Sequence, residues 1–220
     1  MLGGKGNDDR GAGMEHGRRG RTMGGLVVAA LLAAGLTGCA SQLKDYSEPE
    51  QARIDEYERA AQQILRSRGI EGLPPVVQIG SDPSLVNAGR PVAYYTPRAG
   101  FRDAARPGRI VINRAVIADD YIAQAVLSQE LAHFILGHAD GRCQERRHEC
   151  EVEASITSVE LLMTGWDLRY ADAVRLQYAY LKSVLLAVQR GDSSPVAGDR
   201  DPCRQLQEFA TRFKASATCE

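Results

Sequence analysis

Residues 129–133 carry the side chains of this sequence that are best suited to metal chemistry. Gln129 and His133 are four residues apart, so on a helix they project from the same face. An imidazole binds zinc through nitrogen at about 2.0–2.1 Å, and a glutamate placed as Glu130 is can polarise a water molecule on the ion. The amide oxygen of Gln129 is a weak zinc ligand beside imidazole. The segment therefore predicts a metal site in which one ligand position is degenerate.

A further ligand must come from elsewhere in the chain, and Glu151 is the candidate. It opens the run EVEAS at 151–155, in a stretch whose pattern predicts a second helix. With Gln129, His133 and Glu151 as the three ligand positions, Glu130 lies beside the first of them, where a carboxylate can polarise a water on the ion.

The elements that position these residues predict an α+β fold. Residues 121–136 are expected to form the central helix, because Asp119 and Asp120 favour a helix start and Gly137 suits a helix end. Three short β-type runs before it predict a small sheet of about three strands packed on this helix and on further helices. The expected strands are 75–79, 91–96 and 109–113, and the other expected helices are 47–69, 146–163, 170–189 and a short one from 201.

Taken together, three features resemble the gluzincin zinc metallopeptidases of the HtpX-like and BepA-like type. They are the QELAH segment at 129–133 with Gly137-His138 after it, the EVEA run at 151–154, and a preceding hairpin with Asn87-Ala88 and the strand GRIVI at 108–112. The resemblance covers roughly residues 75–190. It implies a zincin-like single domain, a zinc cofactor and a protein or peptide substrate whose backbone binds along one sheet edge. It also implies Glu130 as base, with His133 and Glu151 as ligands.

The sequence departs from that family at two positions. Gln129 stands at the first ligand position, and Ser155 stands where the family usually has an aspartate that orients the ligands. Two functions stay open. One is a zinc metalloendopeptidase that hydrolyses peptide bonds in envelope proteins. The other is a catalytically inactive pseudopeptidase that binds peptides or envelope proteins as an adaptor.

The remaining histidines offer one further ligand set. His148 lies three residues before Glu151, so His133, His148 and Glu151 form an alternative group. His138 is five residues past His133, about 140° further around a regular helix, and is expected to point elsewhere. Both His138 and His148 are otherwise expected to be polar surface residues.

Residues 1–38 have the order of a bacterial lipoprotein signal peptide. A basic stretch (Arg18, Arg19, Arg21) precedes the apolar run at 26–36, and LTGC at 36–39 ends it. Cys39 would then carry the lipid, residues 40–46 would form a tether, and residues 47–220 the domain. Acyl chains would hold the domain on a membrane outside the cytoplasm, at the periplasmic face of the outer membrane in a Gram-negative cell.

The other cysteines and the charge complete the expectations. Two disulfides are expected in an exported domain, and the short sequence separations favour Cys143 with Cys150 and Cys203 with Cys219 among the three pairings that four cysteines allow. Free buried thiols are the alternative. The formal net charge of −1 gives no indication of a nucleic-acid partner.

Overall fold

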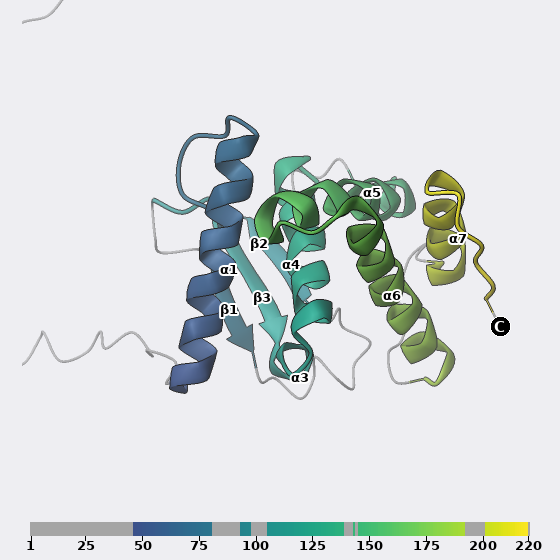
Figure 1. Cartoon of the computed structure of the whole chain (residues 1–220), viewed down its shortest axis with the longest axis horizontal. Helices are drawn as coiled ribbons and strands as arrows, with labels where there is room; N and C mark the ends of the chain where they lie inside the picture. Colours follow the sequence, from purple (N-terminus) through teal and green to yellow (C-terminus); the bar gives the residue numbers. More distant parts are fainter. Residues whose placement is uncertain are drawn as a thin grey trace, which may run out of the picture. The chain divides into compact units, whose positions relative to one another are not determined.

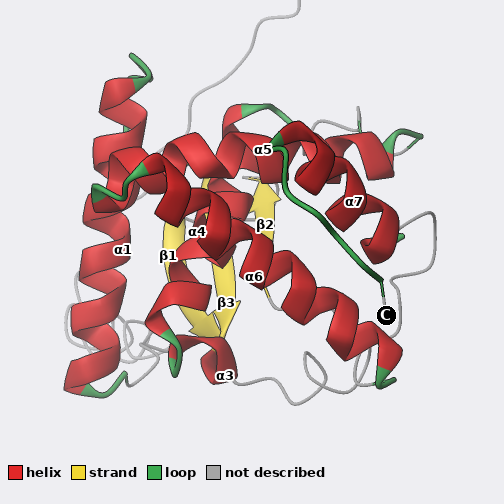
Figure 2. Cartoon of the chain, turned by 45° about the vertical axis from the view of Figure 1, so that its right-hand side comes forward, coloured by secondary structure: helices red, strands yellow, loops and turns green. Residues whose placement is uncertain are grey.

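The computed structural model describes residues 46–80, 93–97, 105–138, 143, 145–191 and 201–219. The predicted signal peptide, the lipidated Cys39, the tether up to residue 45 and the Asn87-Ala88 pair lie outside these residues. By its internal contacts, Tyr46–Glu220 is one compact unit, and Figures 1 and 2 show its helices and strands.

Helix α1 (Glu48–Ser67) begins with a reciprocal cap. The backbone amide and the hydroxyl of Ser47 both lie 2.9 Å from Oε2 of Glu50, which satisfies groups that have no partner within the helix. These bonds hold the pKa of Glu50 below its usual range, the backbone bond most strongly. The helix ends before Gly69, which takes a positive φ of 66°. Its buried face packs on strand β1 (Val76–Gly80) and on helix α5 (Arg147–Trp166).

Three strands form one mixed sheet in the order β1-β3-β2. Strand β3 (Gly108–Asn113) is central. It pairs in parallel with β1 and antiparallel with β2 (Ala93–Pro97), with Tyr95 opposite Ile110. Ile110 and Ile112 are fully buried. Strand β2 is therefore an edge strand of the described sheet, and it contacts helix α4.

Helix α4 (Asp120–Ile135) is the centre of the fold. Oδ1 of Asp119 caps it by accepting from the amides of Tyr121 and Ile122 at 3.1 and 3.2 Å, and the short helix α3 (Arg114–Ile117) leads into it from the sheet. It contacts the sheet, α1, α5 and helix α6 (Tyr170–Gln189) (Figure 1). Because it has neighbours on several sides, it is apolar around its circumference rather than along one stripe.

Three further helices follow α4: the first two contact α4 directly, and the third packs on those two. They are α5 (Arg147–Trp166), α6 (Tyr170–Gln189) and α7 (Pro202–Arg212). The chain after α7 returns along α6 (Figure 2), where Lys182 Nζ donates to the carbonyl of Thr218 at 3.0 Å and Gln189 Nε2 to that of Cys219 at 2.6 Å.

The α+β fold predicted from sequence, with a three-stranded sheet packed on the central helix, is confirmed. The structure adds α3, which is too short to give a periodic pattern, and extends α5 to Trp166, three residues past the predicted end. Within the described residues, no helix combines the length and apolar character that a membrane span requires.

Candidate functional site

The three predicted residues of α4 lie in the interior of the fold. Gln129 is 2% exposed and Glu130 is 8% exposed, while His133 is partly buried near the C-terminal end of the helix. Glu151 comes from the second turn of α5 and is also buried. The packing of α4 against α5 brings the predicted ligand positions together, as the sequence indicated.

The side chain of Gln129 is held by hydrogen bonds at both ends. Its amino group lies 3.4 Å from the backbone carbonyl of Glu151 and 3.5 Å from Oε2 of the same residue. Its oxygen accepts from Nε2 of Gln177 on α6 at 2.9 Å. Both groups of Glu151 are acceptors, so the amide must turn its donor side toward them. The oxygen of Gln129 therefore faces Gln177 and not the side chain of Glu151.

Helix α7 extends these contacts into a larger buried group. Nε2 of Gln205 donates to the hydroxyl of Ser155 at 2.9 Å and to the carbonyl of Glu151 at 3.3 Å, and Ser155 donates to the same carbonyl at 2.7 Å. We call this set the carboxamide network. Its members, from four helices, are Gln129, Glu151, Ser155, Gln177 and Gln205.

The carboxylate of Glu130 faces the sheet. Its Oε2 accepts a hydrogen bond of 2.8 Å from the backbone amide of Tyr95 in β2. The ring of Tyr95 also packs on Phe134, with centroids 5.6 Å apart. The edge strand and the candidate general base are thus directly linked. A negative charge on Glu130 strengthens this bond, since hydrogen bonds to ionised groups are stronger than neutral ones.

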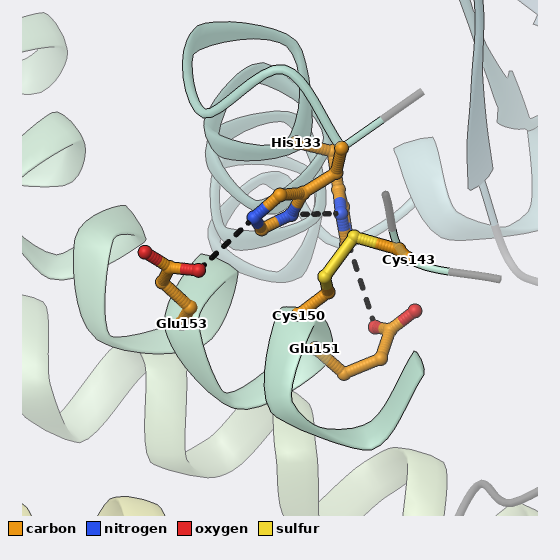
Figure 3. Close-up of a disulfide and its surroundings, with 6 residues drawn as sticks. His133, Cys143, Cys150, Glu151 and Glu153 are labelled. Atoms are coloured by element: carbon orange, nitrogen blue, oxygen red, sulfur yellow. Dashed lines mark hydrogen bonds and ion pairs between the residues drawn. A yellow bond between two sulfur atoms is a disulfide. The ribbon is translucent and has the colours of Figure 1, made fainter. Parts of the chain in front are cut away.

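His133 stands between a carboxylate and a second imidazole. Its Nε2 lies 3.5 Å from Oε2 of Glu151, and its Nδ1 lies 2.9 Å from Nδ1 of His138. Nε2 of His138 in turn lies 3.2 Å from Oε2 of Glu153. Figure 3 shows His133, both glutamates and the Cys143–Cys150 disulfide gathered at this place. Since an Nδ1–Nδ1 hydrogen bond requires one donor and one acceptor, the two rings share one proton there.

The expectation that His138 points elsewhere, on the surface, is wrong. His138 is 7% exposed and touches His133. The angular argument assumed a regular helix, but Gly137 takes a φ of 68° and the amide of His138 bonds back to the carbonyl of His133 at 2.9 Å. This left-handed helix end turns the chain over the last turn of α4 and brings the second imidazole onto the first.

His148 is also buried rather than exposed, at 6%. Its Nε2 lies 3.3 Å from Oε1 of Glu208 on α7, and Arg204 also bonds that carboxylate at 2.8 Å. Burial raises the pKa of Glu208, but hydrogen bonds from His148 and Arg204, with their charges, lower it by more, so the pKa lies below its usual range. His148 thus joins α5 to α7. Among the described residues, no group of side chains close enough to share a metal ion contains His148 together with His133 and Glu151.

The preferred disulfide pairing is confirmed. Cys143 pairs with Cys150 and Cys203 with Cys219, with Cα–Cα distances of 6.0 and 5.5 Å. Within the described residues, the group of potential metal ligands close enough to share an ion is His138, Cys143 and Cys150. This His/Cys/Cys group can hold a metal ion, although both of its cysteines are oxidised in this structure.

The zinc ion implied by the resemblance finds only part of its ligand set. His133 Nε2 and Glu151 Oε2, 3.5 Å apart, are spaced as two ligands at about 2.0–2.2 Å from one ion would be. Gln129 does not complete the set, because it turns an amino group toward Glu151 and its oxygen is taken by Gln177. A cation next to Glu151 would meet an N–H donor instead of a lone pair. The residues present therefore do not fit a three-ligand zinc site.

Three residues at the site were not foreseen. Gln177 and Gln205 sit within helices whose polar positions look like ordinary surface in the sequence, yet they are 0% and 8% exposed. A glutamine among apolar residues at helical spacing was the available signal. Tyr95 acts through its backbone amide, which no side-chain pattern reveals.

A pocket of about 230 Å³ lies beside this region but does not contain it. Its lining includes Phe134, Arg106 and Leu65, and none of Glu130, His133 or Glu151. No family model, no curated protein and no solved structure matches the chain.

Proposed function

We propose that this chain is a non-catalytic derivative of a zinc metallopeptidase, held on the bacterial cell envelope by a lipid, that binds an extended peptide or envelope protein. The observation that carries the proposal is the orientation of Gln129. Its oxygen accepts from Gln177 and its amino group faces Glu151, so the position that would bind metal is part of a buried hydrogen-bonded core.

The chemistry of the network supports loss of the metal. Losing one imidazole removes a large part of the binding free energy, which is about 10–16 kcal/mol for structural zinc in small peptides. Aiming the Gln129 oxygen at an ion would also break its 2.9 Å bond and leave Gln177 Nε2 buried without that partner, at about 1–3 kcal/mol. Ser155, bonded to Gln205, supplies no carboxylate to orient a ligand.

The place proposed for peptide binding is the outer edge of β2. The strand lies at the edge of the described sheet, and an extended peptide can add to such an edge through backbone hydrogen bonds. The amide of Tyr95 points off the sheet toward Glu130. In this proposal a carbonyl of the added peptide accepts the hydrogen bond from the Tyr95 amide. When no peptide is bound, Glu130 accepts that hydrogen bond, and it does not act as a base.

The location is proposed from the sequence of the first 39 residues. The basic stretch, apolar run and LTGC box support export and lipidation at Cys39, and the two disulfides suit an oxidising compartment. The test is fractionation of Cys39→Ala. The variant is expected to leave the membrane fraction, and retention there would refute the lipid anchor.

Metal content tests the central claim. The full chain with both disulfides oxidised, purified without chelators, is expected to hold no stoichiometric zinc, whereas Gln129→His in the same oxidised state is expected to gain zinc that a further Glu151→Ala change removes. Gln207→His is the matched control, because it adds one histidine at an exposed position of α7. Stoichiometric zinc in the unaltered chain, lost in Glu151→Ala, would overturn the proposal.

The second candidate is an active metallopeptidase, and the 3.5 Å spacing of His133 and Glu151 favours it. A peptidase assay separates the two functions. If the chain cleaves peptides and Glu130→Gln abolishes the cleavage, the adaptor proposal fails. If neither protein cleaves and both bind the same unstructured peptides, the adaptor proposal is supported.

A further inference from the structure

The Cys143–Cys150 disulfide joins the segment after α4 to the first turn of α5 beside a buried histidine. Cys150 and His138 are buried and Cys143 is partly buried. One nitrogen of His138 and the two sulfur atoms all lie within 4.8 Å of one another. Three ligand atoms that suit a soft or borderline metal ion therefore lie close together. They come from the end of α4, the start of α5 and the segment between them.

The distances suit a zinc ion once the disulfide is opened. Zinc takes nitrogen at about 2.0–2.1 Å and thiolate sulfur at about 2.3 Å, which places one nitrogen and two sulfur ligands of a tetrahedral ion about 3.5–3.8 Å apart. From their bonded distance of about 2.0 Å the two sulfur atoms must therefore separate by about 1.7 Å, and the His138 nitrogen must move closer by at most about 1.3 Å. A disulfide sulfur carries no negative charge, so the oxidised pair cannot act as two thiolate ligands.

We propose that His138, Cys143 and Cys150 form a redox-gated zinc site: the disulfide excludes the ion, and the reduced pair binds it. A dithiol reductant transfers two electrons and two protons to the disulfide, giving two thiols and the reductant's own disulfide. Zinc then binds both sulfur atoms as thiolates, with release of two protons, and a neutral nitrogen of His138. This proposal concerns a different ligand set from the site at Gln129 and does not rest on the proposed function.

Binding at this site would change the contacts of His133. Both ring nitrogens of His138 have neighbours in the oxidised protein, Nδ1 at His133 and Nε2 at Glu153. Whichever nitrogen takes the ion must give up its present contact. If it is Nε2, the ion displaces the proton shared with Glu153, and if it is Nδ1, His133 loses its partner. In the second case Glu153 keeps its contact with Nε2 and is placed to orient the ring.

The second disulfide gives a matched comparison within the same chain. Cys203 and Cys219 are also partly buried and joined across a similar Cα–Cα distance. Among the described residues, no group of side chains close enough to share a metal ion contains Cys203 or Cys219. Reduction of this pair creates two thiols without an adjacent imidazole, so it controls for metal that binds any pair of reduced cysteines.

The test is metal titration of the full chain carrying Cys39→Ala, oxidised or reduced with a phosphine. Reduced protein is expected to bind one cobalt(II) ion with the near-ultraviolet charge-transfer absorption of a thiolate–cobalt bond, and zinc is expected to displace it. Cys203→Ser with Cys219→Ser should leave this signal unchanged, whereas Cys143→Ser with Cys150→Ser should abolish it. His138→Asn is expected to weaken affinity by about tenfold or more. Equal binding in oxidised and reduced protein, or an unchanged signal without Cys143 and Cys150, would overturn the site.

A stability measurement tests the site even if reduction of the disulfides partly unfolds the protein. A ligand that binds only the folded chain raises its melting temperature. Zinc is therefore expected to raise the melting temperature of the reduced protein, or to restore its helical circular dichroism if reduction has lowered it, and to leave the oxidised protein unchanged. Reduced protein that neither binds zinc nor responds to it in this assay would refute the proposal.

Discussion

Nε2 of Gln177 donates a hydrogen bond of 2.9 Å to the amide oxygen of Gln129, and this bond joins α6 to α4 where both side chains are buried. It holds the amide oxygen of Gln129 on the side away from the carboxylate of Glu151, which the amino group of Gln129 faces. Because of this contact, Gln129 belongs to a buried hydrogen-bonded core and does not offer its oxygen to a metal ion beside Glu151.

Removing the donor while keeping the volume should reveal what the bond contributes. Gln177→Met leaves the oxygen of Gln129 buried without this partner, and the free energy of unfolding is expected to fall by about 1–3 kcal/mol. Urea denaturation followed by circular dichroism measures it. Gln207→Met, at an exposed position, should change the free energy by less than about 0.5 kcal/mol. Equal effects of the two changes would mean that the bond is not important for stability.

The N-cap of α4 gives a second prediction. Asp119→Ala removes the acceptor for the amides of Tyr121 and Ile122, and it should lower the free energy of unfolding by about 1 kcal/mol. Asp119→Asn keeps an acceptor oxygen and serves as the control, with a smaller loss expected. If both changes lower the stability equally in thermal or urea unfolding, the charge of Asp119 matters more than the cap geometry.

The close pairing of β2 and β3 predicts a steric effect at Gly108. A methyl group there would meet the backbone oxygen of Thr96 and the ring of Tyr95, so Gly108→Ala should push β2 outward and lower the free energy of unfolding by about 1–3 kcal/mol. Hydrogen exchange of the Tyr95 amide should become faster, because its bond to Glu130 depends on the position of β2. Arg109→Ala, which adds no atoms at the neighbouring position, should leave that exchange rate nearly unchanged.

The low pKa of Glu208 predicts an acid dependence of stability. A carboxyl group whose pKa is lower in the folded than in the unfolded state stabilises the fold above the unfolded value, and this contribution is lost as the pH falls through the folded value. Unfolded glutamate has a pKa of about 4.3, so the loss is expected below that pH. Glu208→Gln should lose less stability than the unaltered chain over the same acid range. Parallel stability curves for the two proteins would contradict this prediction.

Much of the fold could be predicted because its signals are local. The cap at Ser47 and Glu50 predicts the start of α1, and periodic apolar residues predict the bounds of α1 and α6 to within about two residues. The β-type runs predict the three strands. The resemblance to the gluzincins led us to expect Glu151 beside His133, and their side chains lie 3.5 Å apart.

The surroundings of the site could not be predicted in the same way. Placing His138 required the φ of Gly137, which reverses the chain, and a glycine is compatible with many backbone angles. Gln177 and Gln205 reach Gln129 and Ser155 across helices that lie far apart in the sequence. Such contacts depend on how α6 and α7 are rotated about their axes, and no periodicity specifies that rotation to a single side chain.

Helix α7 completes the interior although it comes late in the chain. Gln205 bonds the carbonyl of Glu151 and the hydroxyl of Ser155, and Leu206 and Phe209 are fully buried beside it. These contacts join the two ends of the domain's helical part, because α5 obtains them from residues some fifty positions later in the chain. A variant truncated before residue 201 would lack the Gln205 donor and the buried Leu206 and Phe209, and the carbonyl of Glu151 would keep fewer of its partners.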